Sequence, residues 1–554
     1  MKKNFIKTTL ALLLIGSIGF VSFKNDDRFF EIARNLDIYA TMFKELNTYY
    51  VDELNPNRMV KTSIDAMLKQ LDPYTNFFAE DEIEDYRTMT TGRYNGIGAV
   101  VGPRQGKTTV LMIYEGTPAE KSGLQVGDEI LKIDGVAIDS KRNANGQDET
   151  GKLLKGQNGT AAKLTVRRYG SDKLLDINVM RDVVKMTNVP FHGMINGEVG
   201  YIDLKDFTAT AAREVRGAVI ELKGKGMKKL ILDVRENPGG LLNMAIDISN
   251  LFIPQGSEVV STKGKVQEWN KSYTALAPPL DLELPIIVIG NSRSASAAEI
   301  VAGVIQDYDR GVLIGQRTFG KGLVQTTRDL SFNTKLKITT AKYYTPSGRC
   351  IQAIDYSHRN ADGSVGRVPD SLKTAYKTKA GRVVYDGGGV TPDIAIEAPN
   401  PAPITRSLTD KGLIFDYAVV YRQTHPTIKP AREFKFTDAD YQEFVKWVGT
   451  KEYDYTTQVE RDLSALEASA RKEKQFDRIQ DQLKALKANV SHSKDTDLVA
   501  FKNELKAELE QEIVGHYYLQ KGMKEASFEA DPELKAALDL FKDMPKYQAI
   551  LKKQ

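Results

Sequence analysis

Polar and apolar positions divide the chain into blocks of different periodicity. Between residues 29 and 71, apolar residues recur at helical spacing on either side of a polar turn. From residue 94 to residue 180, short alternating stretches separated by glycine turns predict a β-rich domain. From residue 200, short apolar runs alternate with helical stretches, and beyond residue 405 the pattern is helical and rich in lysine and glutamate. The blocks therefore predict several domains of different class.

The alternating block after residue 200 is typical of an α/β layer, with strands buried between helices. The predicted strands are 200–204, 229–234, 285–289 and 311–314, and the predicted helices are 208–222, 241–252 and 297–307. Each strand is a short apolar run without charged residues in its centre, which favours burial on both faces.

The N-terminal segment has the layout of a secretory signal. Lys2 and Lys3 precede residues 8–23, which carry no charge, and Lys24 follows them. This run is shorter than the roughly 20 apolar residues of a spanning helix. No Ala-x-Ala cleavage site is present, so both a cleaved signal and an uncleaved membrane anchor remain open. We expect export to a bacterial cell envelope (periplasm).

Composition limits the other classes only broadly. A chain of 554 residues is too long for a single hydrophobic core, so several domains are expected. Its net charge of +4 gives no indication of a nucleic-acid partner. Cys350 is the single cysteine, so no intrachain disulfide can form. The five histidines are scattered and no Cys/His pair has metal-ligand spacing, so we expect neither a metal nor a cofactor.

Ser296 and Lys321 are the candidate catalytic pair, because each follows one of two predicted buried strands. A buried, deprotonated lysine can act as the base for a serine nucleophile without a histidine. Gly239 and Gly240, shortly after the strand 229–234, and the N–H of Ala297 could stabilise an oxyanion.

Two other interpretations of these residues remain open at this point. Ser296 could be an ordinary helix N-cap and Lys321 a surface lysine. His192 and His358 flank the α/β block, so a Ser/His enzyme also remains open.

Four segments of the α/β block resemble the carboxyl-terminal processing (tail-specific) peptidases. They are DVRENPGG (233–240), SASAAE (294–299), GKGLVQ (320–325) and YYTPSGR (343–349), in the order of that family. Where the family has a serine after the last segment, this chain has Cys350, which we expect to serve packing. Residues 94–98 and 115–135 together resemble a PDZ domain.

This resemblance implies specific roles. Ser296 would be the nucleophile, Lys321 the general base and Gln325 the residue that orients the lysine. Ala297 and either Gly239 or Gly240 would donate to the oxyanion. The PDZ loop that receives a terminal carboxylate would consist of Tyr94, Asn95, Gly96, Ile97 and Gly98.

The predicted architecture is a multidomain α/β protein in which a PDZ-like, β-rich domain precedes an α/β peptidase core, with helical regions at both ends. We expect a signal peptide or anchor at 1–24, an N-terminal helical region at 25–92, a PDZ domain at 93–181, a serine peptidase core at 182–400 and a C-terminal helical domain at 401–554.

The predicted function is that of a serine endopeptidase that binds the C-terminal segment of protein or peptide substrates through the PDZ domain. It would then cleave them with the Ser296/Lys321 dyad. The alternative is an inactive PDZ adaptor or chaperone on a peptidase-like scaffold. An adaptor protein as partner, and self-association through the C-terminal helical region, remain open.

Overall fold

The computed structural model describes residues 28–138, 149–490 and 493–552. Their contacts divide the chain into two compact units: Met1–Ala79 with Thr327–Ile338, and Glu80–Thr326 with Thr339–Gln554. In the described part of the chain, no helix has the length and apolar character needed to cross a membrane. The apolar segment 8–23, on which the prediction of a signal or anchor rests, lies outside the described residues.

The first unit contains the two predicted N-terminal helices. A helix over residues 28–49 leaves Phe29 and Phe30 exposed, and α2 (Pro56–Lys69) follows. The side chain of Asn55 accepts a hydrogen bond from the N–H of Arg58 and so caps α2. Strand β1 (Asn76–Phe78) then pairs antiparallel with the start of β18 (Lys335–Tyr344).

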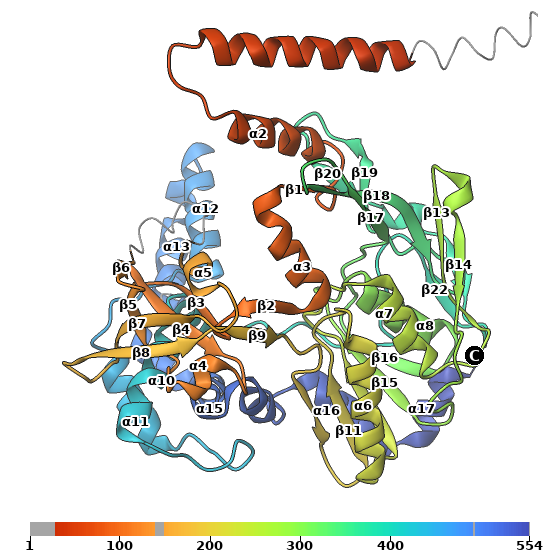
Figure 1. Cartoon of the computed structure of the whole chain (residues 1–554). Helices are drawn as coiled ribbons and strands as arrows, with labels where there is room; N and C mark the ends of the chain where they lie inside the picture. The colour runs from red at the N-terminus through yellow and green to blue at the C-terminus, as the bar shows by residue number, and fades with distance from the viewer. Residues whose placement is uncertain (1–27, 139–148, 491–492, 553–554) are drawn as a thin grey trace, which may run out of the picture. The chain divides into compact units, whose positions relative to one another are not determined.

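In the second unit, a β-rich domain has the strand order β3-β4-β5-β7-β8, and β6 pairs with β5 (Figure 1). The strands are β3 (Ala99–Arg104), β4 (Lys107–Ile113), β5 (Glu129–Ile133), β6 (Val136–Ala137), β7 (Ala161–Arg167) and β8 (Leu174–Met180). The helices α4 (Pro118–Lys121) and α5 (Glu149–Leu154) accompany this sheet, and Val110, Ile133 and Val166 are among its buried core residues.

The chain enters and leaves this domain through a short two-stranded ribbon. Strands β2 (Arg93–Gly96) and β9 (Asp182–Lys185) pair antiparallel, with Tyr94 opposite Val184. Before it, the short helix α3 (Ile83–Thr91) ends at Gly92, whose φ of 67° suits a glycine helix terminus.

The α/β core is a six-stranded sheet with the order β10-β11-β12-β15-β16-β23, parallel from β11 to β23 and antiparallel at β10. Its strands are β10 (Phe191–Met194), β11 (Val199–Asp203), β12 (Lys229–Asp233), β15 (Ile286–Gly290), β16 (Gly311–Gly315) and β23 (Ile394–Ala395). Every residue of β11, β15 and β16 is buried, as the apolar runs predicted for β15 and β16, and in β11 the buried residues include Asp203.

Two different groups of helices cover the two faces of this sheet. The first group is α6 (Ala211–Gly224), α7 (Leu242–Asn250) and α8 (Ala297–Asp307). The second is the C-terminal pair α16 (Pro532–Lys542) and α17 (Met544–Leu551), whose Leu534, Phe541 and Tyr547 pack on the opposite face. The far end of the chain thus completes the three-layer core.

Most predicted elements of the core agree with the structure to within two residues, and helix 297–307 agrees at both ends. The predicted helix 208–222 is wrong at its start, because α6 begins at Ala211. The N–H and hydroxyl of Thr208 both donate to the side chain of Asn188, which holds that residue outside the helix.

A second sheet, which the sequence pattern did not predict, has the order β1-β18-β13-β14, with β17 paired to β18. Its other strands are β13 (Glu258–Gly264), β14 (Lys271–Thr274) and β17 (Leu323–Asp329). Two hairpins follow along the chain: β19 (Ile354–Arg359) with β20 (Val365–Arg367), and β21 (Ala375–Lys377) with β22 (Val383–Tyr385).

The helical region after residue 400 has its own aromatic core, in which Tyr417 packs edge-on against Phe444 and Trp447. Its helices are α9 (Pro403–Asp410), α10 (Leu413–Thr424), α11 (Asp438–Val448), α12 (Gln458–Lys472), α13 (Phe476–Val490), α14 (Lys494–Ala500) and α15 (Lys502–Ser527). Asp416 of α10 binds Arg104 of the β-rich domain at 2.9 Å, so the two domains are in contact.

Candidate active site

Ser296 lies at the turn between strand β15 and helix α8. It is the N-cap residue of α8 and has φ 56° and ψ −114°, a backbone conformation that non-glycine residues seldom adopt. The preceding turn is fixed by Ser294, whose buried hydroxyl donates to the carbonyl of Val234 at 2.7 Å. A strained serine at a strand-to-helix turn is typical of a nucleophile.

Glu299 connects the serine turn to the lysine loop. Its carboxylate accepts the N–H of Ser296 at 2.8 Å and the N–H of Lys321 at 2.9 Å, both on Oε2. Its other oxygen accepts the N–H of Gly320 at 2.7 Å and the hydroxyl of Thr318 at 2.5 Å. Since one oxygen atom binds the main chain of both Ser296 and Lys321, the structure brings these two residues together.

Glu299 is fully buried, and its burial raises the pKa of the carboxyl group, while the four hydrogen bonds oppose that shift. The sequence analysis missed this residue, although it ends the segment 294–299. Its position three residues after an N-cap serine is the signal that could have identified it, since a glutamate there reaches back to the N-cap N–H.

Of the two candidate oxyanion glycines, Gly239 is the one next to Ser296. A Cβ atom added at Gly239 would lie 2.8 Å from Cβ of Ser296 and 2.9 Å from the nitrogen of Ala297. At Gly240 the nearest atoms belong to Phe207 instead. The N–H of Gly239 donates to Oδ1 of Asn237 at 2.8 Å.

Lys321 lies two residues before β17 (Leu323–Asp329), Gln325 lies within that strand, and both are partly buried. The amide nitrogen of Gln325 donates to the hydroxyl of Thr339 at 3.1 Å. The role of Gln325 in orienting the lysine therefore stays a prediction.

Tyr343 is a further neighbour of the nucleophile that the sequence analysis did not assign. Its hydroxyl donates to the carbonyl of Ser296 at 3.2 Å, and its ring is 1% exposed. Burial raises the pKa of Tyr343, so the hydroxyl keeps the proton that it donates. This hydrogen bond holds the main-chain carbonyl group of the strained Ser296 in place.

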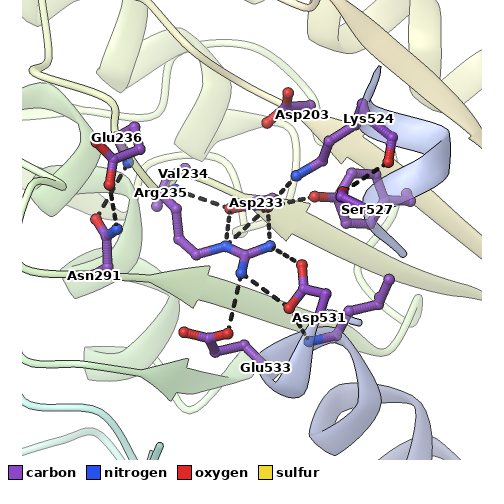
Figure 2. Close-up of polar contacts among 12 residues, drawn as sticks. Asp203, Asp233, Val234, Arg235, Glu236, Asn291, Lys524, Ser527, Asp531 and Glu533 are labelled. Atoms are coloured by element: carbon purple, nitrogen blue, oxygen red, sulfur yellow. Dashed lines mark hydrogen bonds and ion pairs between the residues drawn. The ribbon is translucent and has the colours of Figure 1, made fainter. Parts of the chain in front are cut away.

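Arg235, four residues before Gly239, is the centre of a cluster of charged side chains (Figure 2). Its guanidinium binds Asp233 and Asp531 at 2.6 Å each and Glu533 at 3.2 Å. Lys524 adds a second cation, 3.1 Å from Asp233. Lys524 of α15, Asp531 at the N-cap of α16 and Glu533 of α16 all come from the C-terminal helical region.

Asp233 is fully buried, at the end of β12. Burial alone would raise the pKa of its carboxyl group, but the charges of Arg235 and Lys524 outweigh burial and hold this pKa well below its ordinary value. The hydroxyl of Tyr201 also donates to Asp233. The carboxylate is therefore the anion on which the two cations converge.

The predicted peptide-binding loop lies beside an open sheet edge. Gly96, Ile97 and Gly98 are buried, and the carbonyl of Ile97 accepts the N–H of Ala119 at 2.8 Å. Strand β3, which follows directly, pairs only with β4 in its sheet as described. Among the described residues, the outer edge of β3 has no strand partner.

The side chains of this loop are packed against their own domain. Tyr94 is partly buried, and burial, with the neighbouring Tyr114, raises its pKa to about 12. Gly98, with φ 82°, sits so close to Thr117 that an added Cβ would lie 2.3 Å from Cβ of that threonine. Asn95 pairs with Val183 in the ribbon β2–β9.

The histidines of the α/β block are bonded elsewhere. Nε2 of His192 lies 2.9 Å from Glu221, and Nδ1 of His358 lies 2.6 Å from Asp355. Among the described residues, no group of three or more histidine, cysteine or acidic side chains could hold a metal ion.

Comparison with family models identifies three regions. Residues 95–179 match "PDZ domain", residues 198–358 match "Peptidase family S41" and residues 404–541 match "Probable PDZ-protease, C-terminal helical domain". These matches confirm the predicted order of a PDZ domain, an α/β peptidase core and a C-terminal helical domain.

Relatives of known name extend this result. The chain is 35% identical over 372 residues to a "Carboxy-terminal-processing protease" of Bartonella bacilliformis. The aligned region covers 66% of this chain and 76% of the relative. The chain is 35% identical over 320 residues to a "Probable CtpA-like serine protease" of Staphylococcus aureus, which covers 57% and 62%.

Among solved structures, the photosystem II D1 C-terminal processing protease is similar at 24% identity and a TM-score of 0.34, covering 65% of this chain and 92% of that one. From the relatives and the family models together, the chain belongs to the carboxy-terminal-processing proteases of peptidase family S41 and is a serine peptidase with a PDZ domain.

Proposed function

We propose that this serine peptidase cleaves peptide bonds with Ser296 as nucleophile and Lys321 as general base. The observation that carries the proposal is the shared hydrogen bonding of Glu299 to the main-chain N–H groups of both residues. Ser296 attacks the scissile carbonyl and passes its proton to Lys321, which returns a proton to the leaving amine. Water activated by the lysine then hydrolyses the acyl-enzyme.

The oxyanion of the tetrahedral intermediate is held, in this proposal, by the N–H groups of Ala297 and Gly239. Ala297 begins α8, where the first N–H groups have no acceptor within the helix. Gly239 is the glycine that lies against Ser296. Its N–H now donates to Oδ1 of Asn237, so binding the oxyanion requires this N–H either to donate to both oxygens or to leave Asn237. Gln325, four residues beyond Lys321 and within β17, orients the lysine in this proposal.

The substrate in this proposal is a protein or peptide whose C-terminal segment binds the PDZ domain. The open edge of β3 would take the segment as an added strand, and the loop from Tyr94 to Gly98 would receive the terminal carboxylate. The polypeptide then extends toward the peptidase core for cleavage. From the sequence of residues 2–24 we further propose export to a cell envelope.

A serine-reactive phosphonate and a C-terminal peptide test both parts of the proposal. The phosphonate should label the wild-type protein and not Ser296→Ala, and that variant should lose turnover by at least about 1000-fold. The intact variant should still bind a peptide with a free carboxylate, at least about 10-fold more tightly than the same peptide with a C-terminal amide.

Turnover retained in Ser296→Ala would contradict the nucleophile. Equal affinity for acid and amide peptides would contradict carboxylate recognition and leave the catalytic assignment standing. An inactive adaptor, the alternative function, predicts peptide binding without labelling of the wild-type protein.

A further inference from the structure

The loops that carry Gly239 and Lys321 begin at the ends of β12 and β16, the two strands that flank β15 in the core sheet. Arg235 lies two residues after the end of β12, and Gln316 directly follows β16. The first loop continues to Gly239 and the second to Lys321. Arg235 and Gln316 therefore stand at the points where the two loops leave the sheet.

One carboxylate of the C-terminal helices binds both starting points. Oε2 of Glu533 lies 3.2 Å from Nη1 of Arg235, and Oε1 accepts the side-chain N–H of Gln316 at 2.7 Å. Glu533 is 2% exposed, so water does not compete for these bonds. Each of its oxygens thus bonds to a different loop.

The surroundings of Glu533 leave it little freedom. Asp531 caps helix α16 by accepting the N–H of Leu534 at 2.9 Å, and the same side chain binds Arg235 with both oxygens. Leu534 itself is buried against the core sheet. The first turn of α16 is therefore held by its cap, by apolar packing and by the guanidinium at once.

The last turns of α15 add a third contact to the same place. Nζ of Lys524 lies 3.1 Å from Asp233 Oδ2, in the strand that leads into the first loop. The ring of Phe528 packs edge-on against Tyr201, whose hydroxyl donates to Asp233. Side chains of the C-terminal domain thus surround the end of β12 as well as Arg235.

We propose that Glu533 is a positioning residue of the active site, and that the C-terminal helical domain is a working part of the catalytic centre. Glu533 acts through Arg235 and Gln316, which set the spacing between the oxyanion loop and the lysine loop. Displacement of reacting groups by about 1 Å can cost on the order of 100-fold in rate. The inference rests on the roles proposed above for Gly239 and Lys321.

The test uses the full chain with the variants Glu533→Ala, Glu533→Gln, Gln316→Ala and the double variant Glu533→Ala/Gln316→Ala. The measurements are kcat and KM for a peptide substrate and the rate of phosphonate labelling. Glu529→Ala is the matched control, because Glu529 lies four residues before Glu533 and pairs with Lys435, but its side chain is 78% exposed.

We expect Glu533→Ala to lower kcat and the labelling rate by at least about 10-fold while KM changes by less than about twofold. Glu533→Gln should recover part of this loss, because an amide still offers one acceptor. The double variant should be no slower than Glu533→Ala, since both changes break the same connection. Glu529→Ala should behave as the wild type.

Unchanged kcat in Glu533→Ala, or effects of Glu533→Ala and Gln316→Ala that add fully, would overturn the inference. Phosphonate titration measures the fraction of Glu533→Ala molecules that are active. If a lower active fraction accounts for the entire loss of turnover, the inference is also overturned, because Glu533 would then act only on folding. If Glu533→Ala does not fold, Gln316→Ala decides: an unchanged labelling rate there overturns the inference, and a reduced rate at unchanged KM supports it. Failure of the proposed function looks different, since the wild type itself would not be labelled at Ser296.

Discussion

Asp233 and Glu299 are two fully buried carboxylates of the same peptidase core, and their surroundings differ in charge. Asp233 faces the cations Arg235 and Lys524, whereas Glu299 accepts hydrogen bonds from neutral N–H and hydroxyl groups. Burial favours the protonated form of both. The pKa of Asp233 is nevertheless lowered, because the cations outweigh burial, while burial keeps the pKa of Glu299 raised.

The difference also separates two tasks. The partners of Glu299 lie between residues 296 and 321, so this carboxylate joins parts of one site. The cations around Asp233 come from residues 235 and 524, so this carboxylate joins the core to the C-terminal domain. Asp233, a buried carboxylate surrounded by cations, therefore holds two domains together. Glu299, a buried carboxylate surrounded by neutral donors, shapes the turn of the proposed nucleophile.

The largest effect on stability is expected for Asp233→Asn. The substitution leaves Arg235 and Lys524 buried with less opposite charge, and breaking a buried ion pair from one side costs about 3–5 kcal/mol. Urea unfolding of the full chain should show this fall in the free energy of unfolding. The surface variant Glu529→Ala should lose less than about 1 kcal/mol. Equal losses in the two variants would remove the basis of the comparison.

A smaller loss of stability and a specific loss of activity are expected for Glu299→Gln. The amide has one acceptor oxygen where the carboxylate has two, so donors among Ser296, Lys321 and Thr318 lose their acceptor. Each buried donor without a partner costs about 1–3 kcal/mol. We expect kcat to fall about 100-fold, because the Ser296 turn and the Lys321 loop lose their common anchor.

The two readouts for Glu299→Gln are the free energy of urea unfolding and kcat at saturating substrate. Ala298→Gly, in the same turn of α8, controls for general weakening of the helix by about 1 kcal/mol. An equal fall of kcat in that control would show that the activity depends on helix stability and not on the carboxylate.

The sequence alone predicted the parts of this comparison that depend on local signals. Ser296, Ala297 and Lys321 follow buried strands, and uninterrupted apolar runs predict such strands well. Glu299 was within reach, because it stands three residues after a helix N-cap. The choice between Gly239 and Gly240 needed coordinates, since both follow the same strand and only one lies against Ser296.

The cluster around Asp233 could not be predicted from the sequence. Lys524, Asp531 and Glu533 stand in a region rich in lysine and glutamate, where most charged side chains face solvent, and nothing in the local pattern separates these three from the others. Arg235 and Asp531 are 296 positions apart along the chain. Only the packing of α16 on the second face of the sheet brings them together.

The smallest effect is a difference in how the two variants respond to pH. The pKa of Asp233 in the folded protein is lower than its ordinary value of 3.8, so its contribution to stability is present above pH 3.8 and is lost as pH falls through the folded pKa. The pKa of Glu299 is higher than its ordinary value of 4.5, so folding is favoured most below pH 4.5, and stability is lost as pH rises through the folded pKa.

Urea unfolding of the wild type and both variants between about pH 3 and about pH 8 measures this difference. The stability deficit of Asp233→Asn relative to the wild type should shrink as pH falls below 3.8, because the wild-type carboxylate is then protonated as well. The deficit of Glu299→Gln should shrink in the opposite direction, as pH rises above 4.5, because only the wild type must ionise a buried carboxyl group. If the stability deficits of both variants shrink in the same pH direction, the two carboxylates have the same kind of environment. The distinction between a domain contact at Asp233 and a catalytic turn at Glu299 would then have no electrostatic basis.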